Sequence, residues 1–309
     1  MIFQDNQHTK WQQMLAVTSQ HADILPPLFK NKNRLMIGRF IAENVLMTLL
    51  QYVGLMFVMM TLVPSPIWLA TGTACAFSFM RGLTIMPGVF LGGMLTFFSQ
   101  DITLGMTAIC SGIYMVQTLV LLWVTQQLIS PSLVFHRVCS YLGFVAASGI
   151  ITAIAAFLLA SISYSFTDAC LRWWLANWCS ILVFGLGLVT WDAYFAELDY
   201  LKRSSRITIY ALYGLLAVNS VAILFFAGQT QLFLLLVDTC LLVLLSAKYG
   251  WGGAVAANCL INIIFSVASF MEVIVLYNQS TVPFQIWLIA NAVMSILVAM
   301  NTTSVGRSH

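Results

Sequence analysis

Charged side chains are scarce in this sequence. Of its 309 residues, 7% are charged and 61% are hydrophobic, and the mean hydropathy is +0.93. A soluble domain carries about 25% charged residues, so this composition does not provide a water-exposed surface. One helix needs about 20 apolar residues to cross a bilayer, and the length leaves room for about ten such helices and no soluble catalytic domain. We therefore expect an all-α polytopic integral membrane protein.

The sequence also lacks the motifs of catalysis and metal binding. It contains no P-loop, nucleophile elbow, His-Glu-x-x-His helix or kinase signature. The four histidines are dispersed through polar segments, and the seven cysteines include no Cys-x-x-Cys pair. We predict that the chain is not an enzyme, has no catalytic residues, and takes no metal, no cofactor and no nucleic acid.

Apolar runs bounded by charges, prolines and glycines predict the membrane spans. We expect about ten, at residues 40–63, 66–80, 83–99, 102–128, 138–163, 172–192, 206–227, 230–246, 250–276 and 284–303. The second and third are short for a bilayer, so a re-entrant pair with about eight full spans is the alternative. Both versions cross the membrane an even number of times.

The distribution of cations orients the spans. With the N-terminus in the cytoplasm, every Lys and Arg except Arg172 falls on the cytoplasmic side. This is the asymmetry that the positive-inside rule requires, and it predicts that both termini are cytoplasmic. Bacterial inner membrane is the expected location.

The chain divides by composition into three parts. Residues 1–39 form a polar cytoplasmic segment, 40–304 the membrane domain and 305–309 a cytoplasmic tail. In the first segment Trp11 and Met14 share one helical face, which is typical of an interfacial helix or a docking segment.

Asp238 stands at the centre of the apolar run from Leu232 to Leu245. An ionised side chain at the bilayer centre costs about 2.5–3.5 kcal/mol on insertion scales, so it must face the protein interior, a water pocket or a proton. A lone membrane carboxylate is more often a protonated or ligand-contacting group than a salt-bridged strut. Glu43 is a weaker candidate, because near the inner end of its span it can snorkel or pair with Arg39.

Among the amides within spans, the candidates that need partners in a low-dielectric environment are Gln117, Asn177, Asn219, Asn258 and Asn262. The structural interpretation is interhelical hydrogen bonding, worth about 0.6 kcal/mol for each bond. The functional interpretation places a ligand near Asp238, Asn219, Asn258 and Asn262. Both interpretations stay open.

Three tryptophans near the outer ends of spans complete the set of candidate ligand-binding residues. They are Trp68, Trp173 and Trp174. At that depth a tryptophan is also typical of an interfacial anchor, because its amphipathic ring prefers the headgroup level.

Glycines mark close packing and turns. Gly88 and Gly92 form a Gly-x-x-x-Gly step in the third span, which favours close approach of another helix. A cation shortly before a glycine recurs ahead of the third and ninth spans, as Arg81-Gly82 and as Lys248 before Gly250. This recurrence is consistent with an internal repeat.

Four stretches of the sequence resemble the first class of MASE domains, which are bacterial membrane-associated sensor domains. The stretches are residues 65–72 (Ser-Pro-Ile-Trp-Leu-Ala-Thr-Gly), 81–82 with 87–92 (Arg-Gly and Pro-Gly-Val-Phe-Leu-Gly), 173–178 (Trp-Trp-Leu-Ala-Asn-Trp) and 248–254 (Lys-Tyr-Gly-Trp-Gly-Gly-Ala). They occur in the family's order with comparable spacing. The resemblance implies signal input to a cyclic-di-GMP enzyme or to the histidine kinase of a two-component system.

In that family an output domain usually follows the membrane unit. Here the chain ends nine residues after Met300, so we expect either a truncated protein or a stand-alone unit. The leading hypothesis is a sensory domain that binds a small or lipid-like signal and acts on a cytoplasmic signalling enzyme, in cis or in trans. Its expected partners also include the lipid bilayer and a second copy as a homodimer. A secondary or proton-coupled transporter and a non-catalytic scaffold subunit are the alternatives.

Overall fold

A computed structural model describes residues 32–59, 68–126, 138–162, 166–189, 203–226, 229–270 and 281–305. By its internal contacts the chain divides into two units, Met1–Ala42 and Glu43–His309. Of the first unit the structure describes the helical residues 32–42, and the expected interfacial helix lies outside the described residues. The contacts that position the candidate site lie within the second unit.

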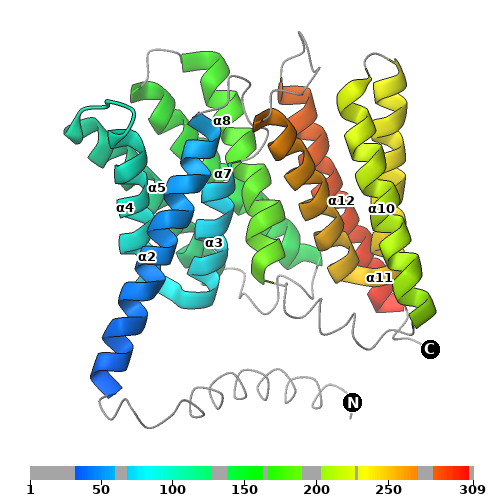
Figure 1. The fold of residues 1–309 in the computed structure, drawn as a ribbon, viewed down its shortest axis with the longest axis horizontal. Coiled ribbons are helices and arrows are strands. Elements are labelled where there is room, and N and C mark those ends of the chain that lie inside the picture. Colours follow the sequence, from blue (N-terminus) through cyan, green and yellow to red (C-terminus); the bar gives the residue numbers. More distant parts are fainter. Residues whose placement is uncertain are drawn as a thin grey trace. The chain divides into compact units, whose positions relative to one another are not determined.

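Every element in the described residues is helical, without a β-strand (Figure 1). In chain order the elements are α2 (Lys32–Met59), α3 (Leu69–Arg81), η2 (Gly82–Ile85), α4 (Met86–Phe98), α5 (Leu104–Val124), α7 (Val138–Ile162), α8 (Phe166–Ser180), η4 (Ile181–Gly185), α10 (Arg203–Phe225), α11 (Gln229–Phe270) and α12 (Thr281–Val305). Eight helical stretches are long and apolar enough to cross a membrane. The all-α class and the multi-pass membrane architecture are therefore confirmed.

Proline placement agrees with these boundaries. Within the described residues, Pro87 and Pro283 stand in the first turns of α4 and α12. A first turn tolerates proline because its backbone N–H groups have no intrahelical acceptor.

The chain reverses direction at Gly82, between α3 and α4. Gly82 has φ 67° and ψ −144°, a conformation that glycine adopts far more readily than other residues. Ala70 of α3 packs against Gly54 of α2. Gly92 of α4 packs against Gln51, one turn away from Gly54 on the same helix. A straight helix would separate Ala70 from Gly92 by about 33 Å, so α3 and α4 form a hairpin.

A second reversal occurs inside α11, at Gly250, which has φ 63° and ψ −150°. Trp287 of α12 touches both halves of this element. Its Nε1 donates to Thr239 Oγ1 over 3.2 Å, and its ring centroid lies 6.5 Å from that of Phe265. A straight helix would place Thr239 and Phe265 about 39 Å apart. The first half of α11, before Gly250, and the second half, after it, therefore run in opposite directions.

The helices around the two turn glycines are arranged alike. We call α2 to α5 the first four-helix group, and α10, the two halves of α11 and α12 the second four-helix group. Phe97 and Phe265 each follow their turn glycine by fifteen residues. Phe97 stacks on Tyr114 of α5 with 6.0 Å between ring centroids, and Phe265 meets Phe284 of α12 at 4.5 Å.

The contacts before the turns recur as well. Ala70 and Asp238 each precede their turn glycine by twelve residues. Ala70 packs against Gly54 of the preceding helix α2, and Asp238 is hydrogen-bonded to Asn219 of the preceding helix α10. These matched positions, like the recurrence of a cation before a glycine in the sequence, are consistent with an internal repeat.

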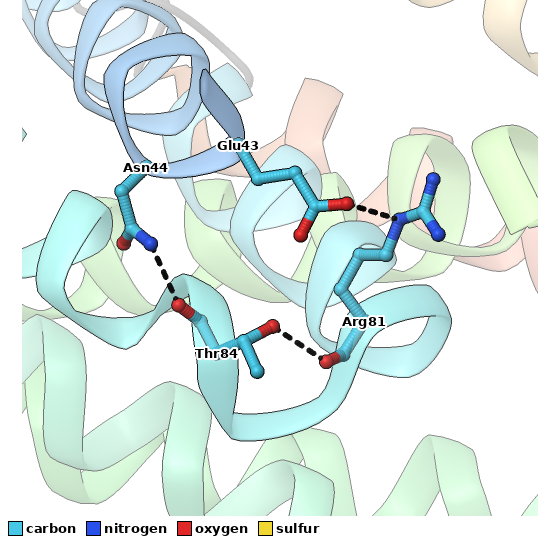
Figure 2. Close-up of polar contacts among 4 residues, drawn as sticks. All are labelled: Glu43, Asn44, Arg81 and Thr84. Atoms are coloured by element: carbon cyan, nitrogen blue, oxygen red, sulfur yellow. Dashed lines mark hydrogen bonds and ion pairs between the residues drawn. The ribbon is translucent and has the colours of Figure 1, made fainter. Parts of the chain in front are cut away.

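The Gly88 and Gly92 step brings α4 against α2. A Cβ atom on Gly88 would lie 2.6 Å from the backbone oxygen of Asn44, and one on Gly92 would lie 2.7 Å from that of Thr48. The predicted close approach is confirmed. Asn44 also fixes the turn, because its Nδ2 donates to the backbone oxygen of Thr84 over 2.8 Å (Figure 2) and its Oδ1 accepts from Gly88 N over 2.7 Å.

The helix α8 lies between the two groups and is the most deeply buried of the membrane-crossing stretches. It packs against α7, α3 and α12. Its helical path continues through the π-helical turn η4, which contacts α3, α11 and α12. A π-helical turn inside an α-helix is uncommon and often occurs at functional sites.

Candidate functional site

Asp238 lies in the first half of α11 and has no exposed surface. Both carboxylate oxygens accept hydrogen bonds from α10. Asn219 Nδ2 donates to Oδ1 over 2.6 Å, and Ser220 Oγ donates to Oδ2 over 2.7 Å. The same Asn219 amide donates to the backbone oxygen of Leu234 over 2.8 Å. Asp238 therefore faces the protein interior, as predicted.

Within the described residues no Lys, Arg or His pairs with Asp238, which is held by the donors on α10. The outward side of this stretch is apolar, with Leu232, Phe233 and Leu236 all exposed. A buried charge or polar group is costly unless it is hydrogen-bonded. The carboxylate consequently depends on the position of α10, and a shift of α10 along α11 would leave it without donors.

The structure brings Asp238 and Asn219 together but places Asn258 and Asn262 in a separate cluster. Asn258 Nδ2 donates to Ser295 Oγ of α12 over 2.7 Å. Asn262 Oδ1 accepts from Cys179 Sγ of α8 over 3.7 Å. The reversal at Gly250 turns this half of α11 toward α8 and α12.

Helix α8 reaches the first four-helix group through Asn177 and Ser180. Asn177 Oδ1 accepts a hydrogen bond from Thr71 Oγ1 of α3. Ser180 Oγ donates to the backbone oxygen of Trp68 over 2.5 Å and accepts from Gly72 N over 3.0 Å. The start of α3 has no capping side chain of its own, so Ser180 supplies an acceptor that its first turn needs.

Consecutive residues of α8 thus bond to different groups. Ser180 contacts α3, whereas Cys179 contacts the second half of α11. In the π-helical turn that follows, the backbone oxygen of Val183 accepts from Cys259 Sγ over 3.6 Å. A few single hydrogen bonds therefore join α8 to both four-helix groups, and a rotation of α8 would change both sets together.

Trp68 and Trp173 belong to an aromatic cluster rather than to an exposed belt. The ring of Trp68 lies 6.0 Å from that of Trp173 and 5.6 Å from that of Tyr114. Trp68 is 2% exposed, so its interpretation as an interfacial anchor is wrong. The residue is enclosed by α5 and α8 instead of facing headgroups.

Trp174, the next residue of α8, contacts α7 rather than Trp68. Its Nε1 donates to the backbone oxygen of Gly149 in α7 over 2.8 Å, and its ring stacks on Trp178. The adjacent tryptophans therefore serve different helix contacts. Gln117 lies on the buried face of α5, and its Oε1 has no hydrogen-bond partner. An unpaired buried acceptor costs about 1–3 kcal/mol.

The sequence interpretation missed the hydroxyl partners of these residues. They are Thr71, Ser180, Ser220 and Ser295. Serine and threonine in membrane helices commonly bond to their own backbone one turn earlier, so their presence in a span gives little functional signal. The adjacency of Ser220 to Asn219 is the one pattern that would have indicated a shared acceptor.

Glu43 has a partner in another helix. Its Oε1 lies 3.3 Å from Nε of Arg81, the residue before the turn glycine (Figure 2). Thr84 Oγ1 donates to the backbone oxygen of Arg81 over 2.8 Å within the same turn. The cation of the Arg81-Gly82 pair thus helps tie the hairpin to α2.

Within the described stretches no three His, Cys, Asp or Glu side chains group as ligands for a metal ion. Comparisons with known protein families, curated proteins and solved structures found no match. The likeness to MASE domains stays a prediction.

Proposed function

We propose that this chain is a membrane-embedded signal-input protein of the bacterial inner membrane, without a catalytic role of its own. It binds a small or lipid-like signal among its helices and acts on a cytoplasmic cyclic-di-GMP enzyme or histidine kinase, in cis or in trans. The observation that carries the proposal is the fully buried Asp238, whose two oxygens depend on donors from one neighbouring helix. The resemblance to MASE domains supports the class of output.

The signal acts by changing helix packing. A molecule that competes for the hydrogen bonds of Asp238 favours an arrangement in which α10 has moved relative to α11. It shifts the equilibrium only by the difference between its affinities for the two arrangements. The second half of α11 is bonded to α12 through Asn258 and Ser295, so repacking of α11 is passed to the last described helix.

We further propose ten membrane crossings with both termini in the cytoplasm, counting each helix of the two hairpins. The reversals at Gly82 and Gly250 support this count. Helices α3 and α4 have 13 residues each, or about 20 Å, against a hydrocarbon core of about 30 Å. A re-entrant α3–α4 pair is therefore the alternative, and it leaves the orientation of the other helices unchanged.

Cysteine labelling separates the two topologies. In a variant without native cysteines, Thr84→Cys should react with a membrane-impermeant maleimide from the cytoplasmic face if α3 and α4 both cross. A re-entrant pair entering from outside would keep residue 84 within the membrane and unlabelled from either face. A tag after residue 305 that is accessible only from outside would contradict the proposed orientation.

The functional proposal is tested by attaching a diguanylate cyclase domain after residue 305 and measuring cyclic-di-GMP in cells. Asp238→Asn should change the cyclic-di-GMP level at equal membrane abundance, because the altered site shifts the packing equilibrium. Ser161→Ala, at an exposed intrahelical position, is the control and should leave the level unchanged. Equal output from the wild type and Asp238→Asn would contradict signal input through this site.

A secondary transporter is the second candidate, and the matched four-helix groups favour it. Many transporters consist of two structural repeats that move against each other around a central site. The repeat around Gly82 and Gly250, with α8 between the groups, fits this plan. Substrate-dependent proton flux into proteoliposomes, absent from protein-free vesicles and reduced in Asp238→Asn, would favour a transporter over a signal-input protein.

A further inference from the structure

Two buried polar atoms in the aromatic cluster of the first four-helix group have no hydrogen-bond partner. They are Trp68 Nε1 and Tyr114 Oη, and both residues are 2% exposed. Their rings touch, with 5.6 Å between centroids. Buried polar groups without partners are rare in folded proteins because desolvation is not compensated. These atoms therefore indicate a site where a bound molecule would supply the missing hydrogen-bond partners.

Gln117 adds an acceptor on the same helix face. It follows Tyr114 by three residues in α5, is 4% exposed, and its Oε1 also lacks a partner. The three side chains offer two donors, the indole N–H and the phenol O–H, and one carbonyl acceptor. A hydroxyl group donates one hydrogen and accepts at two lone pairs, so a single hydroxyl matches this set.

The surroundings favour an uncharged ring as the bearer of that hydroxyl. Trp173 and Phe97 extend the cluster, with ring centroids 6.0 Å from Trp68 and Tyr114, respectively. Among the described residues of this group, every buried polar side chain is uncharged, so a charged ligand would find no buried counter-ion. We propose that Trp68, Tyr114 and Gln117 form a binding site for a neutral hydroxylated aromatic molecule that partitions into the membrane.

The second four-helix group shows that the fold does not require the phenol. Its matching aromatic pair is Phe265 with Phe284, where Phe284 takes the part that Tyr114 plays against Phe97. A ring without a hydroxyl packs there, so this kind of ring contact does not need the hydroxyl of Tyr114.

Binding would act on α8. In this conformation the rings fill the site by packing on one another, and a ligand enters by separating α3 from α5. The first turn of α3 is bonded to Ser180 of α8, so the separation would move the helix that contacts both groups. The site does not involve Asp238, and it stands independently of the proposed function.

The test uses the full chain in lipid nanodiscs with 1-naphthol as the probe and naphthalene as the probe that lacks the hydroxyl. Saturable binding, corrected for empty nanodiscs, should be about 3–10-fold tighter for 1-naphthol than for naphthalene. Trp68→Phe and Tyr114→Phe should each weaken 1-naphthol binding about 3–10-fold and leave naphthalene binding unchanged.

Tyr141→Phe is the matched control, because Tyr141 Oη is also buried and unpaired but lies outside the cluster. Neither Tyr141→Phe nor Asp238→Asn should alter 1-naphthol affinity. Equal affinities for the two probes would overturn the proposal. So would a Tyr114→Phe variant that gains thermal stability and keeps full 1-naphthol affinity, since the hydroxyl would then hold at most a trapped water.

Discussion

The side-chain amide of Asn219 donates two hydrogen bonds, to Asp238 Oδ1 over 2.6 Å and to the backbone oxygen of Leu234 over 2.8 Å. One amide of α10 thus holds two successive turns of α11. Ser220 completes the contact from the next position of α10. The junction joins a buried carboxylate and a backbone oxygen of α11 to the same side chain of α10, so substitutions at Asp238 separate the effect of its shape from that of its charge.

Asp238→Asn should leave the free energy of unfolding nearly unchanged, whereas Asp238→Leu should lower it. Asparagine keeps the shape and the acceptor for Asn219, and the Ser220 hydroxyl can rotate to accept from the new amide. Leucine leaves the Ser220 hydroxyl unpaired and should lower the free energy of unfolding by about 1–3 kcal/mol.

This is measured by thermal unfolding in nanodiscs, followed through reaction of the buried free thiols of Cys75 and Cys179 with a thiol-reactive dye. Exposed Cys139 and Cys240 are first replaced by alanine to lower the background. A stability of Asp238→Leu equal to that of Asp238→Asn would mean that the hydrogen bonds contribute nothing.

Gly82→Ala and Gly250→Ala should each destabilise the protein by about 1–3 kcal/mol, because both positions have positive φ with ψ near −150°. The control is Gly112→Ala in α5, where a Cβ meets no atom within 4 Å and the backbone is helical. Alanine there should stabilise the helix by about 0.5–1 kcal/mol. The same thiol assay reports all three. A harmless Gly250→Ala would show that α11 does not need its reversal.

Ser180→Ala should lower the free energy of unfolding by about 1 kcal/mol, because it removes the acceptor that caps Gly72 N and the donor to the Trp68 carbonyl. Ser161→Ala is the matched control, since the exposed Ser161 hydroxyl bonds back to the Phe157 backbone oxygen in its own helix. Limited proteolysis and thermal unfolding compare the two. If both variants behave alike, α8 does not cap α3.

The Glu43–Arg81 ion pair should contribute little to stability. Their side chains are 20% and 43% exposed, and partly exposed pairs give about 0–1 kcal/mol. A double-mutant cycle with Glu43→Gln and Arg81→Gln in nanodiscs measures the coupling. Raising the salt concentration should reduce it further, and a salt-independent coupling above this range would indicate that lipid shields the pair from solvent.

Several features follow from particular residues of the sequence. Apart from Asp238, residues 232–245 carry no charge, which favours a membrane helix, and the buried position of Asp238 follows from the cost of exposing a carboxylate to lipid. The Gly88 and Gly92 spacing predicts close helix contact because two small residues on one face leave the backbone accessible. The partner helix, α2, does not follow from that spacing.

The candidate site was less predictable. Asn219 and Asp238 meet because α10 and the first half of α11 are neighbours joined by a short connection. Asn258 and Asn262 bond instead to Ser295 of α12 and Cys179 of α8, pairings that a pattern of polar residues does not reveal. Trp68 is buried because α5 and α8 cover it, and no local signal distinguishes a covered tryptophan from an interfacial one.

By itself, then, the sequence determines that this protein lies in a lipid bilayer and that it is helical. The bilayer offers no water to hydrogen-bond the backbone, and a helix satisfies the backbone of so apolar a chain internally. Only the tertiary structure decides which polar side chains meet. Those pairings depend on contacts between residues far apart in the chain, such as Thr71 with Asn177 and Asn258 with Ser295, and their geometry exists only once the helices have packed.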